Sequence, residues 1–216
     1  MIVTSTKPRI LIADDHTLVA TAFAKLLEPE FDVVGQVADG RALLEQAAKL
    51  KPSIVILDLG MPLLNGLDAG KRLKEVAPNS KIIVLTVSED SDVAAEALHR
   101  WASGFLLKKS AAAELTKAVR EVSKGNSYVT PVMTKKLVDK FVRDPGGEKV
   151  KVLTRRQREV LQLLAEGRTM KEVADVLNVT PRTVAFHKYR IMEEFGLKTN
   201  SELFLLAIKE HVIQQP

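Results

Sequence analysis

The sequence contains no cysteine among its 216 residues, which excludes disulfides and thiolate metal sites and suits a reducing compartment. No apolar run approaches the length of a membrane-spanning helix. The first eight residues are polar and lack the apolar core of a signal peptide. We therefore expect a cytoplasmic chain with no membrane partner.

The first 130 residues also lack net charge, with 16 lysines and arginines against 16 aspartates and glutamates. Residues 131–216 hold 16 against 11, so the whole excess of +5 lies there. A hydrophobic share of 46% is ample for one or two cores. A neutral first part and a basic second part indicate two domains with different partners, although a chance surface imbalance would give the same numbers.

Short apolar runs alternate with helical patterns through the first part of the chain. This alternation predicts right-handed βαβ units and an α/β domain with a five-stranded, parallel, doubly wound sheet. The expected strands span 9–13, 32–37, 53–57, 82–86 and 103–107, and the expected helices span 16–27, 40–50, 66–76, 91–100 and 111–124.

A linker separates the two parts. One further helix is expected over 131–143, with Thr130 as its N-cap and proline at its first position. A cluster of proline, glycine and charged residues at 144–149 then interrupts any regular structure. We expect domain boundaries at 1–127, 128–149 and 150–216.

The last part of the sequence predicts a small all-α domain of four helices. Capping boxes begin at Thr154, Thr169 and Thr199, and Thr180 is followed by proline at the first position of another helix. Only residues 178–180 separate the second and third helices, which is the geometry of a helix-turn-helix. The four helices are expected over 155–166, 170–177, 181–195 and 200–210.

Polar side chains follow four of the predicted strands, at the sheet edge where open parallel sheets bind ligands. Asp14 and Asp15 follow the first strand, Asp58 the third, Thr86 ends the fourth, and Lys108 follows the fifth. Each alone is an ordinary cap or strand residue. Together they are the groups that phosphoryl transfer needs: a nucleophile, charge neutralisation and donors to the equatorial oxygens.

The acids of this set predict a cation site. Three converging carboxylates repel one another unless a cation neutralises them, and oxygen-rich acidic clusters suit Mg²⁺. Asp14, Asp15 and Asp58 are the expected ligands, with a main-chain carbonyl near Gly60 as a further one. Asp58 would be the nucleophile.

The segments LIADDH, IVILDLGMPLLNG, IIVLT and SGFLLKKS resemble the receiver domain of bacterial two-component response regulators. Residues 153–197 resemble the LuxR-type helix-turn-helix, and both together resemble the NarL/FixJ class. The resemblance implies that a sensor histidine kinase phosphorylates Asp58 in the presence of Mg²⁺. It also implies that Thr86 and Lys108 contact the phosphoryl group and that Phe105 is the aromatic switch residue.

Three residues depart from the receiver pattern. Val87 stands where the family usually has a small residue and is expected to narrow access to the site and affect the rate of phosphorylation. Phe105 stands where tyrosine is also common, and Lys109 where many receivers have proline. None of the three removes a reactive group.

The second helix of the helix-turn-helix is expected to enter the major groove of DNA. Ala185 replaces a lysine that is frequent in the family, and alanine can touch a thymine methyl group. Two alternatives to DNA contact stay open: the basic residues form a solvated helix face, and His187 has a core or capping role. The expected DNA contacts are Arg182, Thr183, His187, Lys188 and Arg190.

These features predict a phosphorylation-switched transcription factor that binds double-stranded DNA and forms a homodimer when phosphorylated. It would not be an enzyme, apart from catalysing its own phosphorylation and dephosphorylation. A phosphatase of the haloacid dehalogenase type would need an Asp-x-Asp pair, whereas Asp14 and Asp15 are adjacent. The alternative is a constitutive DNA-binding regulator with a weakly active receiver.

Overall fold

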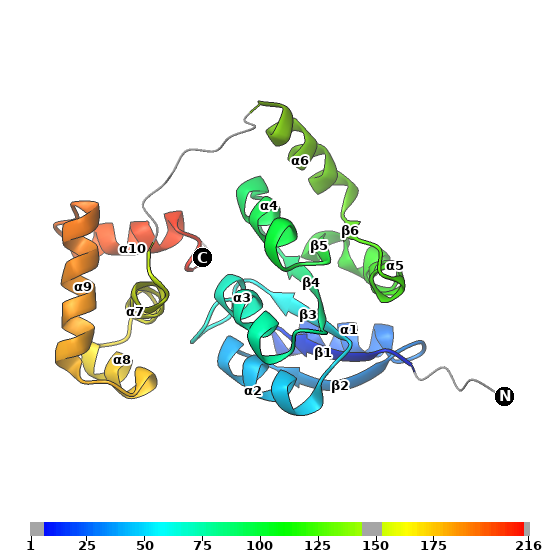
Figure 1. The fold of residues 1–216 in the computed structure, drawn as a ribbon, viewed down its shortest axis with the longest axis horizontal. Helices are drawn as coiled ribbons and strands as arrows, with labels where there is room; N and C mark the ends of the chain where they lie inside the picture. The colour runs from blue at the N-terminus through cyan, green and yellow to red at the C-terminus, as the bar shows by residue number, and fades with distance from the viewer. Residues whose placement is uncertain (1–6, 144–152, 214–216) are drawn as a thin grey trace. The chain divides into compact units, whose positions relative to one another are not determined.

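The computed structural model describes residues 7–143 and 153–213. The chain forms two compact units, the first containing a sheet and its helices and the second helices alone (Figure 1). No helix within the described ranges is long and apolar enough to cross a membrane.

A parallel sheet with the strand order β2-β1-β3-β4-β5-β6 forms the centre of the first unit. The first five strands confirm the predicted ones, while the sixth corrects the expected strand number. That sixth strand has only two residues, too few to show an alternating pattern. The strands are β1 (Arg9–Ala13), β2 (Asp32–Val37), β3 (Ile54–Asp58), β4 (Lys81–Thr86), β5 (Gly104–Leu107) and β6 (Tyr128–Val129).

Helices cover both faces of this sheet, because its strands are apolar on both sides. Helices α1 (Thr17–Leu27) and α5 (Ala111–Lys124) pack on one face against the isoleucines of β1 and β3. Helices α2 (Gly40–Leu50), α3 (Gly66–Val76) and α4 (Ser91–Arg100) follow one another on the opposite face. The result is the predicted doubly wound domain, with a short 3₁₀ turn, Lys108–Ser110, between β5 and α5.

The predicted helix after the sheet is present as α6 (Pro131–Arg143). Thr130 lies at the predicted N-cap position, directly before Pro131, and its carbonyl accepts from the Thr134 N–H at 3.0 Å. Its hydroxyl accepts a hydrogen bond from the Leu107 N–H at 3.3 Å. Met133 is fully buried and Leu137 nearly so, and α6 lies against α4. Segment 128–143, expected as part of the linker, therefore packs on the first unit, while residues 144–152 lie outside the described ranges.

The second unit contains α7 (Arg155–Ala165), α8 (Met170–Leu177), α9 (Pro181–Phe195) and α10 (Asn200–Lys209). All three predicted capping boxes are formed, and the Thr180 hydroxyl caps α9. Asn178 and Gly196 end their helices in the left-handed region, with φ of 51° and 69°. The predicted helix-turn-helix is thus confirmed as α8 and α9.

Candidate functional site

The strand register brings the predicted acidic residues to one edge of the sheet. Ala13 pairs with Leu57, so Asp14 and Asp58 follow at the same level on adjacent strands. Asp58 pairs with Leu85, which places Thr86 one residue further along β4. The carboxyl ends of β1 and β3 meet where the strand order reverses, the usual ligand site of such sheets.

Lys108 joins the two buried carboxylates. Its Nζ lies 2.8 Å from Asp58 Oδ2 and 2.7 Å from Asp14 Oδ2. The side chains of Asp14 and Asp58 are 2% and 4% exposed, and that of Lys108 is 14% exposed. A lysine directly after β5 therefore lies against acids at the ends of β1 and β3, which confirms that these groups converge.

Burial and charge act in opposite directions on these groups. The pKa of Asp58 is raised, chiefly by burial and also by the Asp14 carboxylate, although the Lys108 ammonium lowers it. Burial also lowers the pKa of Lys108, but the carboxylates of Asp58 and Asp14 outweigh that effect and leave it raised. The lysine is firmly charged, and a further cation at the site would help Asp58 to stay ionised.

The oxygen atoms at this edge fit a divalent cation. Ligand atoms of Asp14, Asp15, His16 and Asp58 all lie within 4.8 Å of one another. Asp58 Oδ1 is buried and has no hydrogen-bond partner among the described residues. Carboxylate oxygens with free lone pairs are the ligands that Mg²⁺ prefers. The expected carbonyl ligand near Gly60 stays a prediction.

His16 was not among the predicted residues of the site. Its Nδ1 lies 2.8 Å from Asp15 Oδ1 and 3.3 Å from Asp14 Oδ1, and its backbone N–H donates to Asp14 Oδ1. Its side chain is 66% exposed, so it can swing away when a cation binds the carboxylates. Its position directly after the acid pair was the available sequence signal.

Gly66 fixes the backbone next to the acceptor residue. A Cβ atom at this position would lie 2.0 Å from the Asp58 carbonyl oxygen and 2.7 Å from Leu59 Cα. The Gly66 N–H also donates to the Leu59 carbonyl at 3.0 Å. Only glycine lets the start of α3 approach the end of β3 this closely.

The two predicted switch residues are both buried. Thr86 is inaccessible, and its hydroxyl oxygen accepts a hydrogen bond from the Ser88 N–H at 3.1 Å. Phe105 is also inaccessible, and its carbonyl accepts from the Thr130 N–H. Val87, in contrast, is 65% exposed, so its side chain points largely into solvent. Their expected roles in signalling stay predictions.

Glu89, in the loop between β4 and α4, joins three segments of the first unit. It pairs with Lys109 next to the site, and its carboxylate accepts from Lys136 Nζ of α6 at 2.6 Å. The hydrogen bonds from these two lysines lower the pKa of Glu89 to about 2. A second pair, Lys140 with Asp92, also links α6 to α4. No sequence signal singled out Glu89, because its partners are distant in the chain.

The five predicted DNA-contact residues differ in exposure. Arg182 and Arg190 are exposed, whereas Thr183, His187 and Lys188 are half-buried. The Thr183 hydroxyl lies 3.0 Å from that of Thr180 within the helix cap. Arg190 Nε donates to Glu194 at 2.9 Å.

His187 carries less charge than a solvent-exposed histidine. Burial lowers its pKa below the ordinary value of 6.5, and the charges of Arg156 and Arg190 lower it further. At neutral pH its imidazole is therefore uncharged and can donate or accept a hydrogen bond. Any contact of His187 with a phosphate would not begin as an ion pair.

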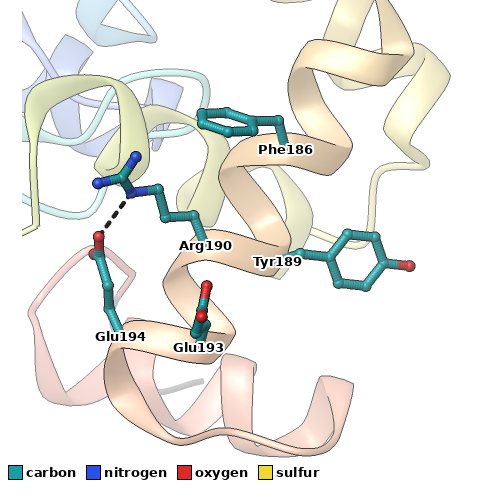
Figure 2. Close-up of a pocket in the computed structure, with 5 residues that line it drawn as sticks. All are labelled: Phe186, Tyr189, Arg190, Glu193 and Glu194. Atoms are coloured by element: carbon teal, nitrogen blue, oxygen red, sulfur yellow. Dashed lines mark hydrogen bonds and ion pairs between the residues drawn. The ribbon is translucent and has the colours of Figure 1, made fainter.

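Sequence reasoning missed the two most exposed aromatic residues of α9. Phe186 and Tyr189 are 57% and 60% exposed. Figure 2 shows both at a surface hollow whose lining is completed by Arg190, Glu193 and Glu194. The available signal was the helical period, because Val184 and Ile191 are buried and mark the opposite face.

The chain matches two family models in succession. The response regulator receiver domain matches residues 10–120, and the luxR family of bacterial regulatory proteins matches residues 151–207. The oxygen regulatory protein NreC of Staphylococcus carnosus is 35% identical over 214 residues, which cover 95% of this chain and 99% of the relative. NreC of Staphylococcus aureus is 34% identical over 215 residues, with the same two coverages.

Solved structures agree with this assignment. A structure of the response regulator RcsB of Salmonella typhimurium aligns with a TM-score of 0.60 and 30% identity, covering 93% of this chain and 98% of RcsB. Another, of two RcsB dimers bound to two parallel DNAs, aligns with a TM-score of 0.58 and 30% identity, covering 92% and 96%. The chain belongs to the NarL/FixJ class of two-component response regulators, DNA-binding proteins in which a receiver domain precedes a LuxR-type helix-turn-helix domain.

Proposed function

We propose that this protein regulates transcription under the control of phosphorylation at Asp58. The observation that carries the proposal is the position of Lys108, whose Nζ contacts both Asp58 and Asp14 at the carboxyl edge of the sheet. A buried acid beside a fixed cation and a buried hydroxyl supplies what an acceptor of a phosphoryl group needs. A sensor histidine kinase, or a small acyl phosphate, would be the donor.

In the transfer step, a carboxylate oxygen of Asp58 attacks the phosphorus of the donor. The new O–P bond forms as the bond from phosphorus to the donor breaks, and the donor leaves with that electron pair. Lys108 then balances the charge of the phosphoryl oxygens, and Thr86 donates its hydroxyl hydrogen to one of them. Mg²⁺, held by Asp14, Asp15, Asp58 and the Gly60 carbonyl, would supply further positive charge.

The residues beside the site would rearrange in response to the added charge. A Thr86 hydroxyl drawn toward the phosphoryl group gives up its bond to the Ser88 N–H, and the loop after β4 changes with it. Phe105 on the neighbouring strand would repack with this loop. The loop includes Glu89, which pairs with Lys136 of α6, so the change would reach α6. Helix α6 is the element that precedes the second unit in the chain.

The output would be a phosphorylated homodimer on double-stranded DNA, as in the relative whose dimers are bound to DNA. Two α9 helices would enter successive major grooves of an inverted or direct repeat. Arg182, Thr183, His187, Lys188 and Arg190 remain the proposed contacts on that helix.

Mass spectrometry tests the acceptor assignment. The protein is incubated with Mg²⁺ and acetyl phosphate, and intact mass and peptide mapping follow the added phosphoryl group. We expect one phosphoryl group on Asp58, none on the Asp58→Asn variant, and unchanged labelling of Asp32→Asn, which alters an exposed carboxylate elsewhere on the same sheet. Equal labelling of Asp58→Asn would overturn the assignment.

A further inference from the structure

Helix α9 presents an aromatic rather than a purely basic outer face. Val184 and Ile191 are buried and define its inner side. At 100° per residue, the opposite side carries Arg182, Phe186, Tyr189 and Glu193, spaced at i, i+4, i+7 and i+11. Two of these four side chains are aromatic, and both are more than half exposed.

The two aromatic side chains point in different directions from α9, and the Arg190 guanidinium lies beside the Phe186 ring (Figure 2). The Arg190 guanidinium lies 5.9 Å from the centre of the Phe186 ring, and Lys188 Nζ lies 5.7 Å from that of Tyr189. Cations at these distances are attracted by the ring faces. Positive charge therefore borders the aromatic pair, and Glu193 and Glu194 lie at its C-terminal end.

We propose that Phe186 and Tyr189 determine the sequence preference of this protein by packing against thymine methyl groups in the major groove of its DNA site. The proposal rests on the proposed function. Thymine is the base that offers an apolar group in this groove, and an aromatic side chain is a suitable partner for its 5-methyl group. Lys188 and Arg190 would then position the helix on the phosphates.

The charge around the pair favours DNA over a second copy of the protein as its occupant. The first three turns of α9 carry Arg182, Lys188 and Arg190 and no acidic residue. Glu193 and Glu194 follow in the last turn, so phosphate contacts are confined to the part of the helix that holds the aromatic pair. A second positively charged α9 would be repelled, whereas the phosphate backbone is attracted.

The test begins with sites selected from a random duplex library by the full-length, acetyl phosphate-treated protein. Each thymine of the selected half-site is then replaced by deoxyuridine, which removes only the methyl group. We expect at least one replacement per half-site to weaken binding about four-fold, the change that corresponds to ~0.8 kcal/mol for one buried carbon group. Replacements outside the half-site serve as the control and should have no effect.

Variants of Phe186 and Tyr189 then identify which side chain contacts each thymine methyl group. Phe186→Asn and Tyr189→Ala should each reduce affinity for the thymine site and abolish the difference between thymine and deoxyuridine at one position. Phe186→Leu, which keeps an apolar side chain, should retain that difference. Circular dichroism and thermal unfolding confirm that each variant is folded.

The outcomes separate this inference from the function on which it rests. If the wild-type protein binds its selected site but every deoxyuridine site binds equally well, the inference is wrong and the regulator remains. It is also wrong if Phe186→Asn and Tyr189→Ala keep the wild-type preference, or change only the sedimentation of the protein. If the phosphorylated wild-type protein selects no DNA at all, the proposed function itself fails.

Discussion

At the scale of single residues, Lys108 stabilises two buried carboxylates, Asp14 and Asp58, by placing a positive charge between them. Replacing it with glutamine leaves Asp14 and Asp58 without their cation, and breaking a buried ion pair in this way costs about 3 kcal/mol or more. We expect Lys108→Gln to lower the free energy of unfolding by that order in urea titrations with a metal chelator. Added Mg²⁺ should restore part of the loss.

The loss in the free energy of unfolding of Lys108→Gln should also depend on pH. Without the lysine, the pKa of Asp58 rises further, so the folded state binds more protons than the unfolded state above the ordinary carboxyl value of 3.8. Stability of the variant should therefore improve as pH falls from 7 toward 5. Lys109→Gln, which alters an exposed neighbour, is the control and should show neither effect. A deficit that does not change with pH would contradict the ion-pair account.

Gly66 provides a second test at this scale. The added Cβ of Gly66→Ala would meet the Asp58 carbonyl oxygen at 2.0 Å, and backbone cannot move aside as a flexible side chain can. Overpacking of this kind costs about 1–3 kcal/mol. We expect lower stability together with slower phosphorylation by acetyl phosphate.

Gly35→Ala is the matched control for Gly66→Ala, because its Cβ would meet side-chain ends rather than backbone: Leu11 Cδ1 at 3.2 Å and Leu50 Cδ1 at 3.4 Å. It should cost less stability and leave phosphorylation unchanged. Similar phosphorylation rates in both variants would show that the start of α3 does not hold Asp58 in position.

At the scale of elements, ion pairs join α6 to α4 through Asp92 and to the loop before α4 through Glu89. Glu89→Gln removes the carboxylate that binds Lys109 and Lys136. Exposed pairs contribute little to global stability, so the expected effect is local. Hydrogen exchange should become faster in the backbone of α6 and stay unchanged in the central strands.

Acidification should also make hydrogen exchange faster in α6 of the wild-type protein. The pKa of Glu89 is lowered from 4.5 to about 2, so its contribution is complete above 4.5 and disappears as pH falls toward 2. Glu45→Gln, which removes an exposed pair with Lys49 on α2, is the control at neutral pH and should leave α6 protected. Unchanged exchange in Glu89→Gln would mean that the Glu89 ion pairs do not hold α6 in place.

Much at this scale followed from local signals in the sequence. Apolar runs ending in Asp14, Asp58, Thr86 and Lys108 were enough to predict the strands and their shared edge. The strand β6 could not be predicted, because two residues carry no period and its pairing depends on a distant neighbour. The contact of α6 with α4 was missed for the same reason.

The surface of α9 illustrates a different limit. Lys188 and His187 were expected to contact DNA because of their charge, yet both are half-buried. The buried Val184 and Ile191 instead place Phe186 and Tyr189 outward. A helical projection from those two apolar residues would have predicted this.

At the scale of the whole molecule, the positive charge of residues 131–216 should appear in the salt dependence of DNA binding. Lys188→Ala should weaken binding to all sequences alike and flatten the slope of log affinity against log salt by about 0.9, since one phosphate contact is lost. Arg182→Ala should instead relax preference at one position if it contacts a guanine edge, where a bidentate contact contributes about 1–3 kcal/mol. Binding titrations on a set of mutated sites separate the two, and unchanged affinity in both variants would remove α9 from the interface.

The most direct test of the central claim is the DNA affinity of the full chain measured before and after treatment with Mg²⁺ and acetyl phosphate. Wild-type protein and the Asp58→Asn variant are titrated side by side on one selected DNA site, and sedimentation is recorded for each sample. Phosphorylation should tighten binding and produce dimers in the wild-type protein, and should change neither in Asp58→Asn. An equal gain in affinity by the variant, or a phosphorylated wild-type protein whose affinity is unchanged, would contradict control of this protein through Asp58.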